Sequence, residues 1–330
     1  MADSEDKTRV VNIVYGRRWR LLDRLGAGGM GNVFRGLDLQ TNQAVAIKTL
    51  GMHLADDVEY VKRFEREARL LSKLKHPAIP RVHELSRHEG MPYFVMSLVE
   101  GQTLGELLLT KKKLIPRFVF SLLNQLAEAL TFLHARGVVH RDLKPDNLIV
   151  DGAGQLSLID FGISAQSNVT RLTLPGVTLG TPLYMAPEAI TSDTTTPSAD
   201  VYAMGLLAFT MLTGAHPFAR EDRAGMMTRQ VNEVPPIAST VSAGISLPVS
   251  KVLARALEKS PTARFPSASE FVEALRRAWG FEKPGVEEFT EEHTEDVPQG
   301  LRPTRPEREA LRPSDVHLRS TLLDADDDGS

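Results

Sequence analysis

The chain changes character near residue 100, and this change restricts the folds that are open to it. Between residues 19 and 99, short apolar or alternating runs are separated by turn residues, which predicts β-strands. We expect strands over residues 19–28, 31–39, 43–50 and 92–99. We expect helices, from their apolar periodicity, over residues 103–110, 116–137, 201–213, 247–259 and 267–279. A small β-rich part followed by a larger helical part predicts an α+β protein with two lobes.

The 330 residues are predicted to divide into four parts. These are an N-terminal extension (1–18), an N-lobe (19–98), a C-lobe (99–279) and a tail (280–330). Residues 281–330 contain fourteen Asp or Glu against six Lys or Arg, a net charge of -8, with little apolar periodicity. Such a segment buries too little apolar surface to offset its ordering entropy, so we expect a disordered acidic tail. The extension resembles the tail, although residues 10–15 (VVNIVY) are apolar enough to pack on the body.

Composition excludes several classes of protein. The net charge of -3 supplies no basic field for nucleic acid or for an acidic membrane surface. The absence of cysteine excludes disulfides and thiolate metal sites. The longest mostly apolar run, residues 201–212, is too short to span a bilayer and predicts a buried core helix. We therefore expect a cytoplasmic protein with no membrane anchor and no nucleic-acid partner.

One helix is predicted within the strand-rich part, over residues 56–76. Asp56, with Glu59 three residues later, is a candidate capping box. The apolar stripe consists of Val58, Val61, Phe64, Ala68 and Leu71. Glu67 falls on this inward stripe, and a buried carboxylate needs a partner. We expect that partner to be Lys48, at the end of the strand that contains VAIK.

Glycines form a GxGxxG pattern in the segment LGAGGMGNVF. Gly26, Gly28 and Gly31 are followed by Val33, and residues on both sides have strand character. A flexible hairpin is the simpler interpretation. A glycine-rich turn between strands also lets backbone N–H groups approach phosphates closely.

Polar residues are concentrated in HRDLKPDN, residues 140–147, between two short apolar runs. So dense a set of polar groups is costly to order unless something binds it. Thirteen residues after Asn147, a strand leads to Asp160. The oxygens of Asn147 and Asp160 suit Mg²⁺ that bridges phosphates, with Mn²⁺ as an alternative. In this interpretation Asp142 accepts the proton of an attacking hydroxyl, and Lys144 neutralises the phosphoryl group in transfer.

These motifs, with DFG (160–162) and APE (186–188), occur in the order found in protein kinases, and the chain resembles the bacterial Hanks-type (eukaryotic-like) serine/threonine kinases. The resemblance implies a bilobal kinase fold and an ATP- and Mg²⁺-dependent protein serine/threonine kinase. It implies that ATP is bound or positioned by Gly26, Gly28, Gly31, Val33, Ala46, Lys48, Glu67 and the gatekeeper Met96. It further implies a structural pair of Glu188 with Arg264, and an Asp200 that anchors the backbone of the catalytic loop.

The segment after DFG contains three candidate phosphorylation sites, Thr173, Thr178 and Thr170, with Thr173 as the first choice. Arg141 adjoins Asp142 and is expected to pair with a phosphate on that segment. Lys144 and Thr181 resemble serine/threonine-specific rather than tyrosine-specific members. Hydroxyl residues of the tail are further candidates for autophosphorylation and for binding partners that read phosphothreonine; a purely solubilising tail is the alternative.

Two other functions compete with a protein kinase. A pseudokinase scaffold is disfavoured because Lys48, Asp142, Asn147 and Asp160 are all present. A small-molecule phosphotransferase of related fold is not expected to carry GTPLYMAPE (180–188) after a threonine-rich loop. The sequence names neither the protein substrate, nor the upstream signal, nor the oligomeric state.

Overall fold

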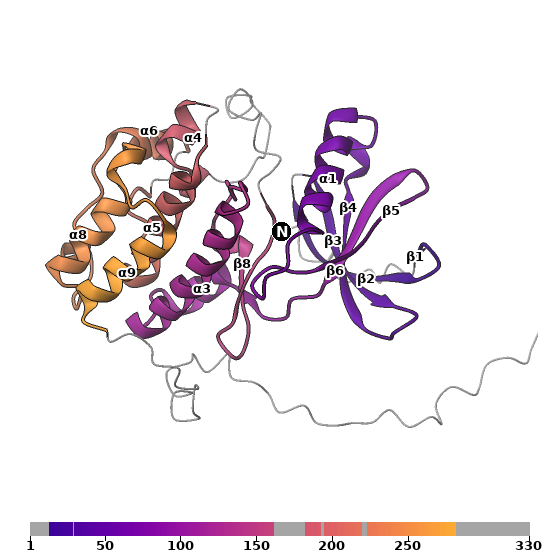
Figure 1. Ribbon diagram of the computed structural model, residues 1–330, viewed down its shortest axis with the longest axis horizontal. Coiled ribbons are helices and arrows are strands. Elements are labelled where there is room, and N and C mark those ends of the chain that lie inside the picture. The colour runs from indigo at the N-terminus through magenta and orange to yellow at the C-terminus, as the bar shows by residue number, and fades with distance from the viewer. Residues whose placement is uncertain (1–12, 29, 162–181, 193–194, 220–222, 282–330) are drawn as a thin grey trace, which may run out of the picture.

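The computed structural model describes residues 13–28, 30–161, 182–192, 195–219 and 223–281. Figure 1 shows a strand-rich lobe that contains α1 and a larger helical lobe, joined by the chain that follows β6. The predicted α+β architecture is therefore confirmed. Among the described residues, no helix combines the length and the apolar character that crossing a membrane requires.

The N-lobe is built on a six-stranded antiparallel sheet in the order β1-β2-β3-β4-β6-β5. Its strands are β1 (Val14–Tyr15), β2 (Trp19–Gly28), β3 (Gly31–Asp38), β4 (Ala44–Leu50), β5 (Val82–His88) and β6 (Met91–Ser97). The sequence predicted β2, β3, β4 and β6 to within two residues at each end. It did not predict β5, an edge strand whose polar and charged residues weaken the apolar signal.

The short strand β1 attaches the end of the predicted N-terminal extension to this sheet. Val14 pairs with Arg20, and Tyr15 pairs with Trp19. The Tyr15 ring stacks on His88 with centroids 4.1 Å apart and lies 4.9 Å from the Tyr93 ring. Val14 and Tyr15 thus attach to the body, whereas Ile13 is 47% exposed.

Helix α1 (Val58–Leu71) follows a 3₁₀ turn, η2 (Met52–Leu54), and packs against β5 and β6. Its N-cap is Asp57, whose carboxylate accepts from the backbone N–H groups of Glu59 and Tyr60. The capping role predicted for Asp56 is therefore wrong by one residue. Val58 is also 62% exposed and Val61 is only partly buried, so the fully buried stripe begins at Phe64.

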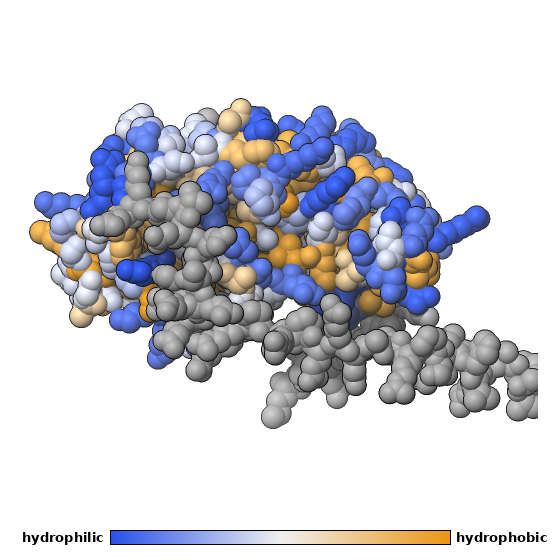
Figure 2. Space-filling model, turned by 60° about the horizontal axis from the view of Figure 1, so that its bottom comes forward, coloured by the Kyte–Doolittle hydropathy of each residue, from blue (hydrophilic) through white to orange (hydrophobic). Residues whose placement is uncertain are grey.

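The C-lobe contains most of the helices. They are α2 (Leu104–Lys111), α3 (Pro116–His134), α4 (Pro187–Thr191), α5 (Pro197–Thr213), α6 (Arg223–Asn232), α7 (Ala238–Val241), α8 (Leu247–Ala256) and α9 (Ala268–Trp279). The predicted core helix is α5, which is buried along most of its length and packs against α3 and α8. The sequence did not predict α6, whose mean composition is polar. Figure 2 shows hydrophilic residues over much of one face, with hydrophobic residues in patches between them.

Short 3₁₀ turns and a small sheet complete the C-lobe. The turns are η3 (Pro145–Asn147), η6 (Pro182–Tyr184) and η7 (Pro261–Ala263), and the strands are β7 (Gln102–Thr103), β8 (Leu148–Val150) and β9 (Leu156–Leu158). The sheet order is β7-β8-β9, with Leu148 opposite Leu158. Because η3 enters β8 and Asp160 follows β9, this pairing brings together two polar segments that the sequence separates.

Candidate active site

Lys48 of β4 joins the two lobes. Its ammonium donates to Glu67 Oε1 of α1 at 2.9 Å and to Asp160 Oδ1, after β9, at 2.7 Å. Glu67 is 1% exposed, as its place on the inward stripe predicted. The Lys48–Glu67 ion pair that the sequence predicted is confirmed. The direct contact of Lys48 with Asp160 was not predicted.

These three groups shift one another's protonation. Burial lowers the pKa of Lys48, but the charges of Glu67 and Asp160 outweigh burial, so that the pKa lies above its ordinary value. The Lys48 charge lowers the pKa of Asp160 against the opposing effect of burial. Burial raises the pKa of Glu67, and the Lys48 charge lowers it only in part. The cluster therefore holds one ammonium between an ionised Asp160 and a deeply buried Glu67.

The catalytic-loop residues form a second cluster beside the first. Lys144 Nζ donates to Asp142 Oδ2 at 2.8 Å. The Asn147 amide donates to the Asp142 carbonyl at 2.7 Å and to Asp142 Oδ2 at 3.0 Å. It also lies 3.5 Å from the Asp160 carbonyl, which links the loop to the end of β9. The Asn147 side-chain nitrogen thus orients the Asp142 carboxylate, and the side-chain oxygen, which can only accept, takes no part in these bonds.

Two residues of the site adopt backbone conformations that are unusual for residues with a Cβ. Arg141 has a φ of 71° and Asp160 has a φ of 53°. Such conformations persist where surrounding contacts impose them. Asp200 of α5 supplies such contacts at the loop, because its carboxylate accepts from the backbone N–H groups of His140 at 2.9 Å and Arg141 at 3.0 Å. This is the backbone anchor that the sequence assigned to Asp200.

Asp200 has a third partner that the sequence did not predict. His134 Nε2, in the last turn of α3, lies 2.7 Å from Asp200 Oδ2. A histidine six residues before His140 was the available signal, but its spacing alone does not identify a contact with α5.

The glycine-rich turn joins β2 to β3, between the strands where the sequence placed it. A Cβ on Gly31 would collide with the Thr49 carbonyl, so this position requires glycine for packing. A Cβ on Gly26 would meet nothing within 4 Å, and one on Gly28 only Gly31 O at 3.9 Å. Protein packing therefore explains Gly31, whereas the space beside Gly26 and Gly28 stays open to a ligand.

Three apolar positions assigned to the nucleotide lie on adjacent strands. Val33 of β3 is opposite Lys48, and Ala46 of β4 is opposite Met96 of β6. Ala46 is buried, and Met96 is half-buried against the core. Sheet pairing thus brings these residues close to Lys48.

Glu188 of α4 and Arg264, after η7, form a bidentate ion pair with both N···O distances at 2.7 Å. The Arg264 side chain is 0% exposed. The pair predicted from the sequence is therefore present. The candidate phosphorylation sites Thr170, Thr173 and Thr178, together with Thr181, lie outside the described residues.

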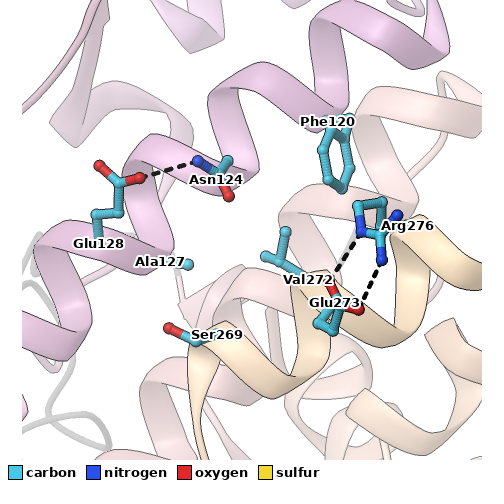
Figure 3. A pocket seen from close by; sticks show the side chains of 8 residues that line it. All are labelled: Phe120, Asn124, Ala127, Glu128, Ser269, Val272, Glu273 and Arg276. Carbon is cyan, nitrogen blue, oxygen red and sulfur yellow. Dashed lines mark hydrogen bonds and ion pairs between the residues drawn. The ribbon is translucent and has the colours of Figure 1, made fainter. Parts of the chain in front are cut away.

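A separate hollow of about 270 Å³ lies between α3 and α9 (Figure 3). It is lined by Phe120, Asn124, Ala127, Glu128, Ser269, Val272, Glu273 and Arg276. Four of its polar residues pair with one another, Asn124 with Glu128 at 2.9 Å and Arg276 with Glu273 at 2.7 Å. No residue assigned to catalysis or to nucleotide binding lines it, so this hollow is distinct from the site around Lys48 and Asp142.

Comparison with known proteins assigns this arrangement to a family. A model of the protein kinase domain matches residues 19–279. The chain belongs to the protein kinase family. The resemblance to bacterial Hanks-type serine/threonine kinases is confirmed by its relatives, which include the serine/threonine-protein kinases PrkC of Bacillus subtilis and PknA of Mycobacterium tuberculosis.

PrkC is 30% identical over 284 residues, which cover 86% of this chain and 44% of PrkC. PknA is 32% identical over 270 residues, which cover 80% of this chain and 62% of PknA. The chain therefore spans roughly half of the length of these relatives. The crystal structure of the M. tuberculosis PknI kinase domain is similar with a TM-score of 0.66 and 27% identity, covering 83% of this chain and 100% of that domain. This likeness confirms the protein kinase fold.

Proposed function

We propose that this protein transfers the γ-phosphate of ATP to serine or threonine hydroxyls of proteins. The observation that carries the proposal is the convergence of Lys48, Asp142, Asn147 and Asp160 from three separate segments of both lobes. Family membership supports phosphoryl transfer as the reaction. A scaffold without catalysis would not need this set of charged and amide groups held in contact.

Each side chain has a role in this reaction. Asp142, oriented by Asn147, accepts the proton of the attacking hydroxyl. Lys144, 2.8 Å from Asp142, neutralises charge on the phosphoryl group in transfer. Lys48, held by Glu67, pairs with phosphate oxygens of ATP. The open space beside Gly26 and Gly28 supports phosphate binding by the turn between β2 and β3.

Asn147 and Asp160 would hold the divalent metal that the family uses, and we propose Mg²⁺, with Mn²⁺ as an alternative. The donor set fits a hard cation, because it offers one amide oxygen and one carboxylate that the Lys48 charge keeps ionised. Among the described residues, no group of three or more His, Asp or Glu could hold a metal, so phosphates and water would complete the coordination. When bound, the metal neutralises phosphate charge.

The test uses purified protein, radiolabelled ATP and a degenerate Ser/Thr peptide library, beside a panel of small alcohols. Transfer to peptide hydroxyls that requires a divalent metal, and its loss in Asp142→Asn, is the expected result. Phosphorylated small alcohols without phosphopeptides would replace the proposal with a small-molecule phosphotransferase. ATP binding with no transfer to either class would indicate a pseudokinase scaffold.

We also propose autophosphorylation on Thr173, Thr178 or Thr170. Burial lowers the pKa of Arg141, the Asp200 charge raises it, and the charge of Arg66 on α1 lowers it. The positive charges of Arg141 and Arg66 thus oppose each other, and a phosphate that pairs with Arg141 would offset this repulsion. Mass spectrometry of protein incubated with ATP should find phosphate on one of these threonines. A fully active enzyme without it would overturn this part of the proposal.

The lobe boundary at residues 98–99 and a cytoplasmic location stay predictions. The same holds for phosphothreonine-reading partners of the tail, because residues 282–330 lie outside the described part of the chain. Deletion of residues 285–330 should spare transfer to added peptide, since every motif lies upstream.

A further inference from the structure

The chain segment 182–186 re-enters the described structure in the C-lobe, where η6 contacts α5, the helix whose Asp200 binds the backbone of the catalytic loop. Burial raises the pKa of Tyr184 to about 12, a hydrogen bond to Thr210 opposes this shift, and the Asp146 charge adds to it. Asn147 bonds to Asp142 and lies 3.5 Å from the Asp160 carbonyl, and Asp160 in turn binds Lys48, so the groups assigned to the nucleotide lie on that side of Asp142. A protein acceptor would then approach Asp142 from another side, and segment 182–186 is a C-lobe candidate for contacting it.

Gln230 of α6 binds this segment through two backbone carbonyls. Its side-chain amide donates to the carbonyl of Leu183 and, at 3.1 Å, to that of Met185. A carboxamide nitrogen carries two hydrogens, so these two bonds use both donors. Gln230 is 0% exposed, although glutamine is usually a surface residue. Its burial indicates a specific task at this position.

His216, after α5, binds the same carbonyl of Leu183. Its Nε2 donates to that oxygen at 2.9 Å, and its Nδ1 accepts from the Phe218 N–H at 3.2 Å, which fixes the tautomer. Burial lowers the pKa of His216 to about 4, so the ring acts as a neutral donor near neutral pH. The Tyr184 ring meets His216 edge-on, with centroids 5.2 Å apart.

Lys259 connects the helix that carries Gln230 to the segment that follows His216. Lys259 Nζ donates to the backbone carbonyl of Gln230 at 2.7 Å and lies 4.2 Å from the centre of the Phe218 ring. Beyond Ala186, α4 is fixed by the ion pair of Glu188 with Arg264. Contacts of α6 with η6 and with α4 extend along the whole segment, and Figure 1 shows α4 and α6 side by side.

We propose that His216 and Gln230 are positioning residues that hold segment 182–186 in the shape that receives the protein acceptor. This inference rests on the proposed function. The two side chains form hydrogen bonds to backbone groups of the segment, so they set its path and leave its half-buried Leu183 and Met185 side chains to contact the acceptor. Neither residue contacts Lys48, Asp142 or Asp160 in the described structure.

The test compares Gln230→Met, His216→Phe and the double variant with the wild type. The acceptor is the peptide pool that the wild type phosphorylates fastest. We expect the KM for peptide to rise about tenfold in each single variant, because a buried carbonyl loses a donor. The double variant should exceed the product of the single effects, because the Leu183 carbonyl then loses both donors. The affinity for ATP, measured by direct titration, should stay within about twofold, since the nucleotide groups are untouched.

The matched control is Asn232→Ala, an exposed residue of the same helix that bonds only within α6 in the described structure, and no change is expected. A peptide KM within twofold of wild type in both single variants and in the double variant overturns the proposal. An equal loss of ATP affinity also overturns it, since that indicates general damage to the fold. If Gln230→Met does not fold, the peptide KM and the ATP affinity of His216→Phe alone decide by the same criteria. A wild type without phosphoryl transfer refutes the proposed function first, and the acceptor role falls with it.

Discussion

Two ion pairs, Glu188–Arg264 in the C-lobe and Lys48–Glu67 in the N-lobe, differ in how many hydrogen-bond donors of the cation are bound within the protein. Arg264 donates to Glu188 at both terminal nitrogens and to the carbonyls of Glu258, Ser198 and Lys259. These contacts use all five donors of a guanidinium. Lys48 has two hydrogen bonds among the described residues, and one of its partners, Asp160, has a side chain that is 43% exposed.

This difference separates a structural pair from a functional one. A cation with every donor satisfied inside the protein has no capacity to bind a ligand, and removing it leaves several groups unsatisfied at once. A cation that faces a partly exposed carboxylate can exchange that contact for a phosphate. The same kind of ion pair therefore has a fully bound cation in the C-lobe and, at Lys48, a cation that can exchange a partner for a ligand.

The largest expected effect concerns the Glu188–Arg264 pair, in which every donor of the cation is bound. Arg264→Met should lower the free energy of unfolding by about 3–5 kcal/mol, because the partly buried Glu188 and three backbone carbonyls lose their donor. Urea titration measures the change, and Arg277→Met, at an exposed arginine of α9, should shift it by less than about 0.5 kcal/mol. A loss below about 1 kcal/mol for Arg264→Met would contradict a structural role.

Removal of the cation from the Lys48–Glu67 pair should lower activity more than stability. Lys48→Met should reduce kcat/KM by about 10²–10³, because a positive charge on the phosphates is lost. Its unfolding free energy should fall less than that of Arg264→Met, since Glu67 can take up a proton. Lys62→Met, at an exposed lysine of α1, serves as the control and should keep wild-type activity. Near-normal turnover of Lys48→Met would refute the assignment.

The pH dependence of that variant sharpens the comparison. Burial raises the pKa of Glu67, and without Lys48 nothing within the described pair opposes this shift. A carboxyl with a raised pKa in the folded state stabilises below its unfolded pKa and loses that contribution as pH rises through the folded pKa. Lys48→Met should therefore lose about 1–2 kcal/mol of stability as the pH rises from about 5 to 8. Lys48→Met/Glu67→Gln should lack this slope; a slope that persists would show that another group titrates.

The smallest effect concerns the helix that carries Glu67. Asp57→Ala should cost about 1 kcal/mol, because the first N–H groups of α1 lose their acceptor. Asp56→Ala is the matched control, with the same chemistry one residue earlier and no expected cost. Chemical unfolding and hydrogen exchange of the α1 amides measure both variants. An effect of Asp56→Ala equal to that of Asp57→Ala would restore the cap to the position predicted from sequence.

Asp56 and Asp57 also illustrate where sequence reasoning ends. Two adjacent carboxylates have nearly equal capping propensity, and the backbone angle at the helix entry decides between them. Helix α6 and strand β5 escaped prediction for a related reason. Their polar composition hides the apolar period, and neighbouring elements stabilise them in place of their own propensity.

The sequence by itself determined the α+β order of elements, the buried position of Glu67 and the identity of the motif residues. These features depend on local periodicity and residue type, which a chain expresses before it folds. Only the tertiary structure decided that Lys48 also meets Asp160, that His134 joins Asp200, and that Gln230 and His216 share one carbonyl. These contacts join residues far apart in the chain, and their geometry follows from how sheets and helices pack, which no short-range pattern records.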